Sequence, residues 1–396
     1  MANLETNFIG MTSPNPFWIA SGPPSDKDYN VHRAFEAGWG GVVWKTLGEN
    51  PHIGNVNGPR YAVLHGNERQ VIGFNNIELI TDRPLQTNLK EMTQIKRDWP
   101  DRPLIASVML PMNEASWAKY VPMIEDTGAD AFELNFGCPH GMSERGMGAA
   151  VGQVPEYVQM AAEWCKKHAS IPVIDKLTPN ITHILHPAKA AKAGGADAVS
   201  LINTINSIMR VDCDSLTMYL TTDGMGTHGG YCGEAVKPIA LNMVAEIART
   251  AETHDIPISG IGGLNNFLDE KGMASVHDLV GKAVPSVTDW KYLNLNYIEK
   301  ATIDQDLCIK CGKCHIACED TSHQAITHTV DGERKFVVKD EECVVCNLCV
   351  GVCPIENCIT MKPMTEGVDP RTGLEVNPEH ADWRTHPNNP LKEQEG

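Results

Sequence analysis

The segment Thr127–Asn135, TGADAFELN, contains the end of a helix at glycine, a tight turn and a short apolar strand. Two other segments repeat this pattern: AGWGGVVWK at Ala37–Lys45 and AGGADAVSLIN at Ala193–Asn203. These strands are too apolar to expose one face to water, so we expect both faces to be buried, as in parallel sheets. The repeated pattern therefore predicts a parallel sheet with helical crossovers.

Other segments extend the alternation of strand and helix. Further strands are expected near Phe17, Leu104, Ile171 and Ile256, and helices at 114–126, 155–168 and 235–250. With about seven such units, the sequence favours an α/β fold of the (β/α)8 barrel type over an open doubly wound sheet.

Polar side chains stand where several of these strands end, namely at Lys45-Thr46, Asn135, Lys176 and Asn203-Thr204. In a barrel, the carboxyl ends of all strands open onto one face, and that face carries the active site. One strand-end lysine could simply be solvated, but four polar strand ends together indicate a functional site.

The composition excludes several classes of function. The 396 residues carry a net charge of −17, which argues against a nucleic acid or an anionic membrane surface as partner. The sequence has neither a signal-peptide pattern at its start nor an apolar run of the ~18 residues that a membrane helix needs. Nine of the thirteen cysteines lie between Cys308 and Cys358. We therefore expect a cytoplasmic protein whose thiols are reduced for metal ligation.

Eight of these cysteines repeat one spacing twice. CIKCGKCHIACE, from Cys308, and CVVCNLCVGVCP, from Cys343, both read C-x2-C-x2-C-x3-C. In bacterial two-cluster ferredoxins with this spacing, the fourth cysteine of each run ligates the other cluster. A four-cysteine zinc site is the alternative, but it fits this doubled pattern poorly. The expected ligands are Cys308, Cys311, Cys314 and Cys353 for one [4Fe–4S] cluster, and Cys343, Cys346, Cys349 and Cys318 for the second.

The segment GMGTHG, Gly224–Gly229, matches the dinucleotide-binding pattern G-x-G-x-x-G. It does not follow a buried strand or open a helix, and no acidic residue is suitably placed after a second strand. We read it as a substrate-side loop and do not expect NAD(P)H to bind this chain.

These features divide the chain into three parts: a barrel at 1–298, a ferredoxin-like domain with two [4Fe–4S] clusters at 299–362, and a polar tail at 363–396. The tail is rich in proline and charge, without a helical or strand period, and is expected to be extended or disordered.

One cysteine stands apart from the cluster runs. NFGCPHGM, Asn135–Met142, puts Cys138 in a short Gly/Pro loop directly after a buried strand. This position favours a reactive thiol over a structural one, whereas His140 is either a site residue or a residue that shapes the loop. The other four cysteines are expected to be ordinary small or buried residues: Cys165, Cys213, Cys232 and Cys358.

Several motifs together resemble the FMN barrel of the dihydroorotate dehydrogenases and, more closely, the flavin- and cluster-bearing subunit of NAD-dependent dihydropyrimidine dehydrogenases. They are NNIELI, CPHGMSERGMG, KLTPN, GGADAVSLINT and HGGYCGEAVKPIAL, followed by the ferredoxin-like tail. The resemblance runs from about Phe8 to Met361. It implies a hetero-oligomer in which a partner subunit carries FAD and the NADH site.

The resemblance also implies site residues. Cys138 would transfer a proton to the substrate. FMN would be lined by Ala20, Lys45, Thr46, Lys176 and Gly233, with Gly262 and Gly263 near its phosphate. The pyrimidine would be held by Asn76, Asn135, Phe136, Gly137, Asn203 and Thr204.

Residue chemistry agrees with these roles. Asparagine amides both donate and accept, which suits the alternating edge of a uracil ring. A lysine near the flavin stabilises negative charge on the reduced ring. Reducing the C5=C6 bond takes a hydride and a proton, and a thiol with an unperturbed pKa of ~8.5 can supply the proton.

The sequence departs from the family pattern after SGIGG, Ser259–Gly263, where the family continues with a helix, an eighth strand and a further helix. Here the chain goes directly to LNNFLDEKG. We count about seven strands, and the missing β/α unit would need roughly 40 residues. The break is expected at Gly263–Leu264, as a true deletion or as residues left out.

The expected function is reduction of uracil or thymine to the 5,6-dihydro form. NADH would supply the electrons through the partner subunit, and they would pass through the iron–sulfur clusters to FMN. Two alternatives stay open: an FMN enzyme acting on dihydroorotate or another cyclic imide, and an electron-transfer module whose barrel has lost flavin.

Overall fold

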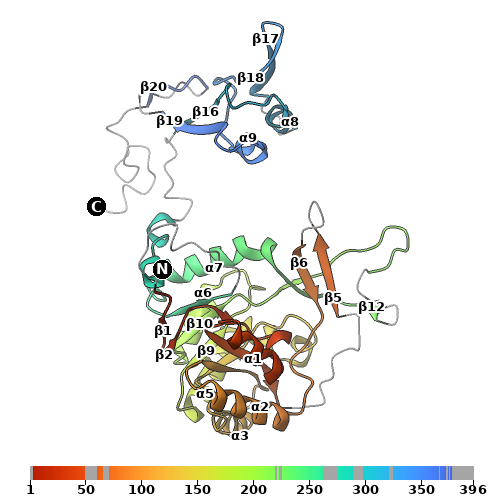
Figure 1. Cartoon of the computed structure of the whole chain (residues 1–396), viewed down its shortest axis with the longest axis vertical. Helices are drawn as coiled ribbons and strands as arrows, with labels where there is room; N and C mark the ends of the chain where they lie inside the picture. The colour runs from red at the N-terminus through yellow and green to blue at the C-terminus, as the bar shows by residue number, and fades with distance from the viewer. Residues whose placement is uncertain are drawn as a thin grey trace. The chain divides into compact units, whose positions relative to one another are not determined.

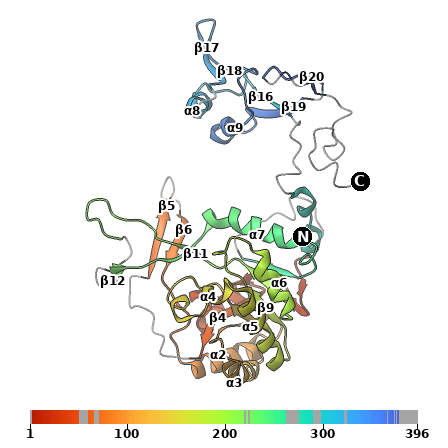
Figure 2. The same cartoon turned by 180° about the vertical axis from the view of Figure 1, so that it is seen from behind.

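The computed structural model describes two units, Met1–Val287 and Thr288–Gly396 (Figures 1 and 2). The described residues are 3–49, 60–65, 71–218, 221–222, 225–261, 275–288, 298–320, 324–364, 366–371, 373 and 375–376. Within them, no helix combines the length and apolar character needed to cross a membrane.

The framework of the first unit is a sheet of seven parallel strands. Its spatial order is the chain order without a reversal, as in a barrel wall, whereas a doubly wound sheet reverses at its switch point. The expected parallel α/β fold is thereby confirmed. From one edge to the other the strands are β3 (Trp18–Ile19), β4 (Gly41–Gly48), β7 (Leu104–Met109), β8 (Ala131–Asn135), β9 (Val173–Lys176), β10 (Ala198–Leu201) and β15 (Ile258–Gly260).

Helices cover the outer face of this sheet, where they share one hydrophobic core with the strands. Trp44 and Phe132 from the strands and Met92 and Val158 from the helices are fully buried in it. The helices are α1 (Asp28–Glu36), α2 (Leu85–Asp98), α3 (Glu114–Glu125), α4 (Ala149–Gly152), α5 (Pro155–His168), α6 (Leu185–Ala193) and α7 (Lys237–Arg249).

A hairpin covers the amino end of the sheet. Its strands β1 (Thr6–Phe8) and β2 (Met11–Ser13) pair antiparallel. Met11 packs against Ile105 and Ile174, which point to the inner face of the sheet. The inner face is therefore apolar at its amino end, and the polar groups lie nearer the carboxyl end.

A second, antiparallel sheet was not expected from the sequence. Its strands run in the order β11 (Ile205–Ser207), β14 (Gly229–Cys232), β6 (Val71–Asn76) and β5 (Tyr61–His65). β5 and β6 stand out from the body of the unit in both views (Figures 1 and 2). The sheet ties segments from both halves of the chain to the same region.

Short elements complete the unit. They are η1 (Pro23–Ser25), η3 (Ser143–Arg145), β12 (Thr221–Thr222), β13 (Met225–Gly226), η4 (Glu234–Val236), η5 (Val276–Leu279) and η6 (Val284–Ser286).

The parallel sheet does not close on itself within the described residues. β3 pairs only with β4, and β15 pairs only with β10, so the two edges have no described strand between them. This agrees with a barrel that lacks one β/α unit. The expected break at Gly263–Leu264 lies outside the described residues.

The described residues of the second unit form three small antiparallel pairs and two helices, and two of these pairs lie with the cysteine runs. β16 (Glu299–Ile303) pairs with β19 (Ile359–Pro363), and β17 (Ile326–Val330) pairs with β18 (Glu333–Val338). Phe336 and Ile326 lie in a small core together with cysteine side chains. The helices α8 (Lys313–Asp320) and α9 (Leu348–Val352) lie within the two cysteine runs, so that α8 carries Cys314 and Cys318 and α9 carries Cys349.

The first part of the expected polar tail is more ordered than predicted. β20 (Gly367–Val368) pairs antiparallel with β21 (Glu375–Val376). The Asp369 carboxylate lies 2.6 Å from Lys300 Nζ, which fixes the turn to β16. This ion pair between distant segments explains why composition alone did not predict the hairpin. Residues 377–396 lie outside the described residues.

Candidate active site and cluster sites

Hydroxyl and amide side chains meet at the carboxyl ends of β4, β7 and β8. Thr46 Oγ1 lies 2.9 Å from Ser107 Oγ and accepts a 2.9 Å hydrogen bond from Asn135 Nδ2. Asn203 Nδ2, in the segment after β10, donates to Asn135 Oδ1 over 2.8 Å. The structure thus joins three predicted site residues, Thr46, Asn135 and Asn203, in one hydrogen-bonded row.

Close packing shapes the loop that follows β8. A Cβ atom at Gly137 would lie 2.3 Å from Asn203 Cβ, so only glycine leaves room for that amide. Gly137 N also donates to Asn135 Oδ1 over 3.2 Å. The Phe136 side chain is buried in the main core, so only its backbone is available to a ligand.

Three further predicted residues lie on or beside the antiparallel sheet. Asn76 Nδ2 donates to Gly230 O over 3.0 Å, so the sheet itself uses this amide. A Cβ atom at Gly230 would lie 2.1 Å from Thr204 Oγ1, and one at Gly233 would lie 2.7 Å from Gly73 Cα. Asn76, Thr204 and Gly233 are therefore brought together mainly by strand packing.

Lys45 is surrounded by acidic groups that the sequence analysis missed. Its Nζ lies 2.6 Å from Glu78 Oε1 and 3.7 Å from Asp26 Oδ2. Arg60 and Tyr61 also donate to the Glu78 carboxylate. Burial raises the pKa of Asp26, and the charge of Lys45 opposes that shift. Burial and the charge of Glu78 raise the pKa of Tyr61 to about 12.

Lys176 ends β9 on the inner face, where it is only 6% exposed. Its Nζ lies 3.7 Å from Glu133 Oε2 on β8, and Ser200 Oγ on β10 donates to Glu133 Oε1 over 2.9 Å. Lys176 is also in register with Asn135. This second polar row therefore adjoins the amide row, so that the inner face is polar at its carboxyl end.

Cys138 is buried against Met109 and Met142 in the loop after β8. Burial raises the pKa of its thiol to about 11, while the backbone of His140 and the charge of Lys176 act in the opposite direction. Cys138 Sγ lies 3.5 Å from His140 O, to which it donates. The thiol therefore keeps its proton at neutral pH, which is the state a proton donor requires.

His140 links the Cys138 loop to the segment after β6. Its Nε2 lies 3.1 Å from Glu78 O, and its Nδ1 is buried and has no hydrogen-bond partner among the described residues. Burial lowers the pKa of the imidazole, so the ring is neutral at pH 7. With Nε2 donating to a carbonyl, Nδ1 has no proton to give. These contacts are compatible with both roles considered for His140.

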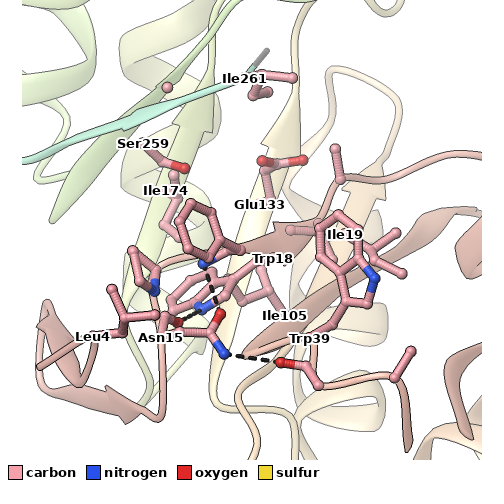
Figure 3. A pocket seen from close by; sticks show the side chains of 17 residues that line it. Leu4, Asn15, Trp18, Ile19, Trp39, Ile105, Glu133, Ile174, Ser259 and Ile261 are labelled. Atoms are coloured by element: carbon pink, nitrogen blue, oxygen red, sulfur yellow. Dashed lines mark hydrogen bonds between the residues drawn. The ribbon is translucent and has the colours of Figure 1, made fainter. Parts of the chain in front are cut away.

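A cavity of about 660 Å³ opens between the edge strands β3 and β15. Glu133 and Ile261 lie at one end of it, and Trp18 and Trp39 lie at the other (Figure 3). Ala20, which is expected to line the flavin, also contributes to its wall. The cavity therefore reaches the polar carboxyl end of the inner face.

The described groups fit the ring end of FMN. Lys45 and Lys176 are buried cations, as needed beside a reduced flavin ring that carries negative charge. Thr46 adds a hydroxyl, and Glu133 Oε2 is a buried acceptor for which the described part of the chain supplies no hydrogen-bond donor. The residues expected at the phosphate, Gly262 and Gly263, lie outside the described residues.

The cysteines of the second unit surround two cavities. In each cavity, three cysteines of one run are joined by the fourth cysteine of the other run, which is the grouping predicted from the spacing. In the described residues, no three His, Cys, Asp or Glu side chains are grouped as a single metal ion would require. Four thiols around a cavity fit a cuboidal cluster. The sets are Cys308, Cys311, Cys314 and Cys353, and Cys318, Cys343, Cys346 and Cys349.

Cys358 also lines the first of these cavities, although the sequence suggested only an ordinary small residue. It is 2% exposed, and its Sγ lies 3.7 Å from Asp304 O. A ninth thiol therefore lies beside the predicted ligands of one cluster.

Comparison with known families agrees with this two-part organisation. Residues 3–274 match the dihydroorotate dehydrogenase family, and residues 301–361 match the 4Fe-4S dicluster domain. The first match covers more than half of the chain. The cofactors of these families are FMN and two [4Fe–4S] clusters.

Two relatives are dihydropyrimidine dehydrogenases. The chain is 35% identical to the NAD-dependent dihydropyrimidine dehydrogenase subunit PreA of Escherichia coli (strain K12), over 91% of this chain and 95% of that protein. It is 44% identical to the chloroplastic dihydropyrimidine dehydrogenase (NADP(+)) of Arabidopsis thaliana, over 67% of this chain and 65% of that protein. The chain thus spans just under two thirds of the plant enzyme.

The bacterial alignment also bears on the open sheet. It extends over 397 positions, but 91% of this 396-residue chain is about 360 residues. About 37 positions of the relative therefore have no counterpart here, close to the length expected for one β/α unit.

A solved structure shows the same fold. The Eimeria tenella DHODH, crystallised in complex with ferulenol, matches with a TM-score of 0.53 and 20% identity, over 68% of this chain and 75% of that one. With the family matches and the 35% identity over most of the chain, the conclusion is direct: the chain belongs to the family of dihydroorotate and dihydropyrimidine dehydrogenases, and it carries a 4Fe-4S dicluster domain.

Proposed function

We propose that this chain is the catalytic subunit of a dihydropyrimidine dehydrogenase that reduces the C5=C6 bond of uracil or thymine. The electrons would come from NADH on an FAD-containing partner subunit and pass through the two clusters of this chain. The observation that carries the proposal is the amide pair Asn135–Asn203 beside the Cys138 loop, with the buried Lys45 and Lys176 at the same face.

The amide pair suits a pyrimidine edge. Uracil presents alternating donors and acceptors, and an asparagine amide offers both functions. Asn203 is held by Asn135 and by the narrow space at Gly137, so its amide is positioned before a ligand arrives. Such preorganised groups orient a planar ring at low entropic cost.

Cys138 suits the proton step. Its thiol is protonated at neutral pH, and it lies in the loop directly after the strand that carries Asn135. FMN, when bound, supplies the hydride to the other carbon of the double bond. Lys176, whose charge reaches the thiol, would stabilise the thiolate that remains on Cys138.

A substrate assay tests the proposal. The full chain is loaded with iron, sulfide and excess FMN and supplied with an artificial low-potential electron donor. Formation of dihydrouracil or dihydrothymine is expected. Turnover of dihydroorotate or orotate alone would favour the dihydroorotate alternative. A loaded chain that binds clusters but no flavin would favour the electron-transfer module.

A further inference from the structure

Three side chains form a polar row across the inner face of the sheet, below the proposed pyrimidine site. Ser200 Oγ donates to Glu133 Oε1 over 2.9 Å, and Lys176 Nζ lies 3.7 Å from Glu133 Oε2. All three residues are at least 94% buried, with exposures of 1%, 3% and 6%. Since ions lose hydration when they are buried, such a carboxylate and ammonium need each other's charge.

Lys176 lies in register with Asn135, the last residue of β8 before the Cys138 loop. Its register partners are Asn135 on β8 and Ser200 on β10, so its side chain leaves the sheet beside both polar rows. Its charge also reaches the Cys138 thiol, where it favours the thiolate. One ammonium group is therefore shared by a carboxylate and by the thiol.

We propose that Glu133 is a positioning residue that holds Lys176 at the strand end beside the Cys138 loop and moderates the positive charge that the thiol meets. This proposal deepens the proposed function, because it concerns the same proton donor. The carboxylate acts through Lys176, with which it pairs across the neighbouring strands β8 and β9.

The proton step explains why the charge of Lys176 matters to Cys138. When the S–H bond of Cys138 breaks and the new C–H bond forms, the electron pair stays on sulfur and a buried thiolate remains. Lys176 compensates that charge. With Glu133 beside it, the same ammonium lowers the pKa of the resting thiol by less than an unpaired ammonium would.

Other ionisable groups lie near the Cys138 loop, and their own titration contributes to any pH curve measured for the thiol. Lys176 is the charged side chain whose field is resolved at the thiol. The contacts of Cys138 with β7 and with the residue before α4 are uncharged, through Met109 and Gly148. The remaining ionisable groups act on or adjoin His140 of the same loop: Glu78, Glu144 and His228.

The test measures alkylation of Cys138 by iodoacetamide in the full chain without flavin. The rate is followed by peptide mass spectrometry across pH 7–12. The midpoint of the rate curve reports thiol acidity, and its high-pH plateau reports access. In Glu133→Gln, the amide still accepts from Ser200 but the counter-charge is lost. We expect the midpoint to fall, so that alkylation at pH 9 rises roughly tenfold, as for a one-unit effect of a nearby charge.

Lys176→Met gives the opposite expectation, with a higher midpoint and slower alkylation. A purely structural role would move both variants in the same direction. Asp175→Asn is the matched control: Asp175 is the fully buried neighbour of Lys176 on β9, and because side chains alternate along a strand it faces the opposite side of the sheet. It should leave the Cys138 midpoint unchanged.

An unchanged midpoint in Glu133→Gln, or a shift in the same direction as Lys176→Met, would overturn the proposal. The readout needs neither FMN nor substrate. A chain that fails to reduce pyrimidines would therefore count against the proposed function without affecting this result, and the reverse also holds.

Discussion

At the scale of single residues, burial determines how Cys138 can act. A thiol in water ionises within the range where many enzymes work, but here burial moves its pKa to about 11. The protonated form is therefore almost fully populated at neutral pH. The cost is weaker acidity, which Lys176 offsets in part as thiolate forms. The site therefore favours a protonated thiol that can donate its proton over a thiolate that could act as a nucleophile.

Replacing this donor should slow the reaction without removing the cofactor. In Cys138→Ser, the alkanol is a much weaker acid than the thiol, so we expect pyrimidine reduction to fall by roughly 10²- to 10⁴-fold. Flavin should still bind and be reduced. Steady-state rates and flavin spectra of the assembled enzyme measure both effects. Cys213→Ser, at an exposed position, is the control. Near-normal turnover of Cys138→Ser would refute the general-acid role.

The pH dependence of this step follows from the same shift. Because the folded-state pKa of Cys138 is raised from 9.0 to about 11, the protonated thiol is stabilised below pH 9 and this advantage is lost as pH rises through 11. The rate ratio of the native enzyme to Cys138→Ser should therefore be constant from pH 7 to 9 and fall above about pH 10. A ratio that already falls near pH 8 would contradict the burial argument.

At the scale of elements, the parallel strands were predictable and the antiparallel sheet was not. β4, β8 and β10 follow glycine turns as apolar runs, a local signal that needs no tertiary information. β6 and β14 are short and rich in glycine and polar residues, and they pair across more than 150 residues.

Some side-chain pairs were likewise not predictable, because they form between segments that only the folded chain brings together. Lys45 was expected at the flavin, but its ion pair with Glu78 exists only once the second sheet has formed. Glu78 lies in the segment NNIELI, one of the motifs that carry the family resemblance. The charged residue in that motif was the sequence signal that could have indicated a partner for Lys45. The placement of Phe136 in the core likewise depends on helix packing that the loop sequence does not reveal.

The grouping of the cysteines leads to an element-scale prediction. Cys318 ends the first run but lines the cavity of the second, while Cys353 does the converse. Cys318→Ala should therefore impair the cluster of the second run, and Cys353→Ala that of the first. Iron analysis and EPR spectra of reduced protein distinguish them when each variant is compared with Cys311→Ala and Cys346→Ala. If Cys318→Ala matched Cys311→Ala instead, the crossed ligation would be wrong.

At the scale of the whole molecule, the proposed electron path needs a second subunit. The G-x-G-x-x-G match at Gly224–Gly229 contains β13 and ends at the first residue of β14. It does not open a helix, so it lacks the context of a dinucleotide site. We expect the isolated loaded chain not to oxidise NADH, yet to reduce uracil with an artificial low-potential donor. NADH consumption by highly purified chain, free of other flavoproteins, would contradict the two-subunit model.

The open sheet is the second property of the whole molecule, and it agrees with the shortfall of this chain against its bacterial relative. A barrel closes only when strand number, tilt and shear agree. Seven strands are described, the edges β3 and β15 border a cavity of about 660 Å³, and about 37 positions of the bacterial relative have no counterpart. The count of strands in the sequence predicted this deficit, but only the structure locates the cavity between the two edges.

Supplying the missing unit should therefore improve flavin binding. In this fold, the phosphate is held by loops after strands 7 and 8 and by a helix N-terminus, so this chain retains at most half of that site. Inserting the corresponding β/α unit of the bacterial relative between Gly263 and Leu264 should lower the FMN Kd roughly tenfold or more, the equivalent of about 1.4 kcal/mol. It should also raise the melting temperature of the barrel, because two strand edges gain partners.

Fluorescence titration with FMN and calorimetry measure the two effects, and a Gly/Ser insertion of equal length is the control. The clusters should be unaffected, since their cysteines all lie in the second unit. If the unmodified chain bound FMN as tightly as the variant with the added unit, the barrel would not need an eighth strand.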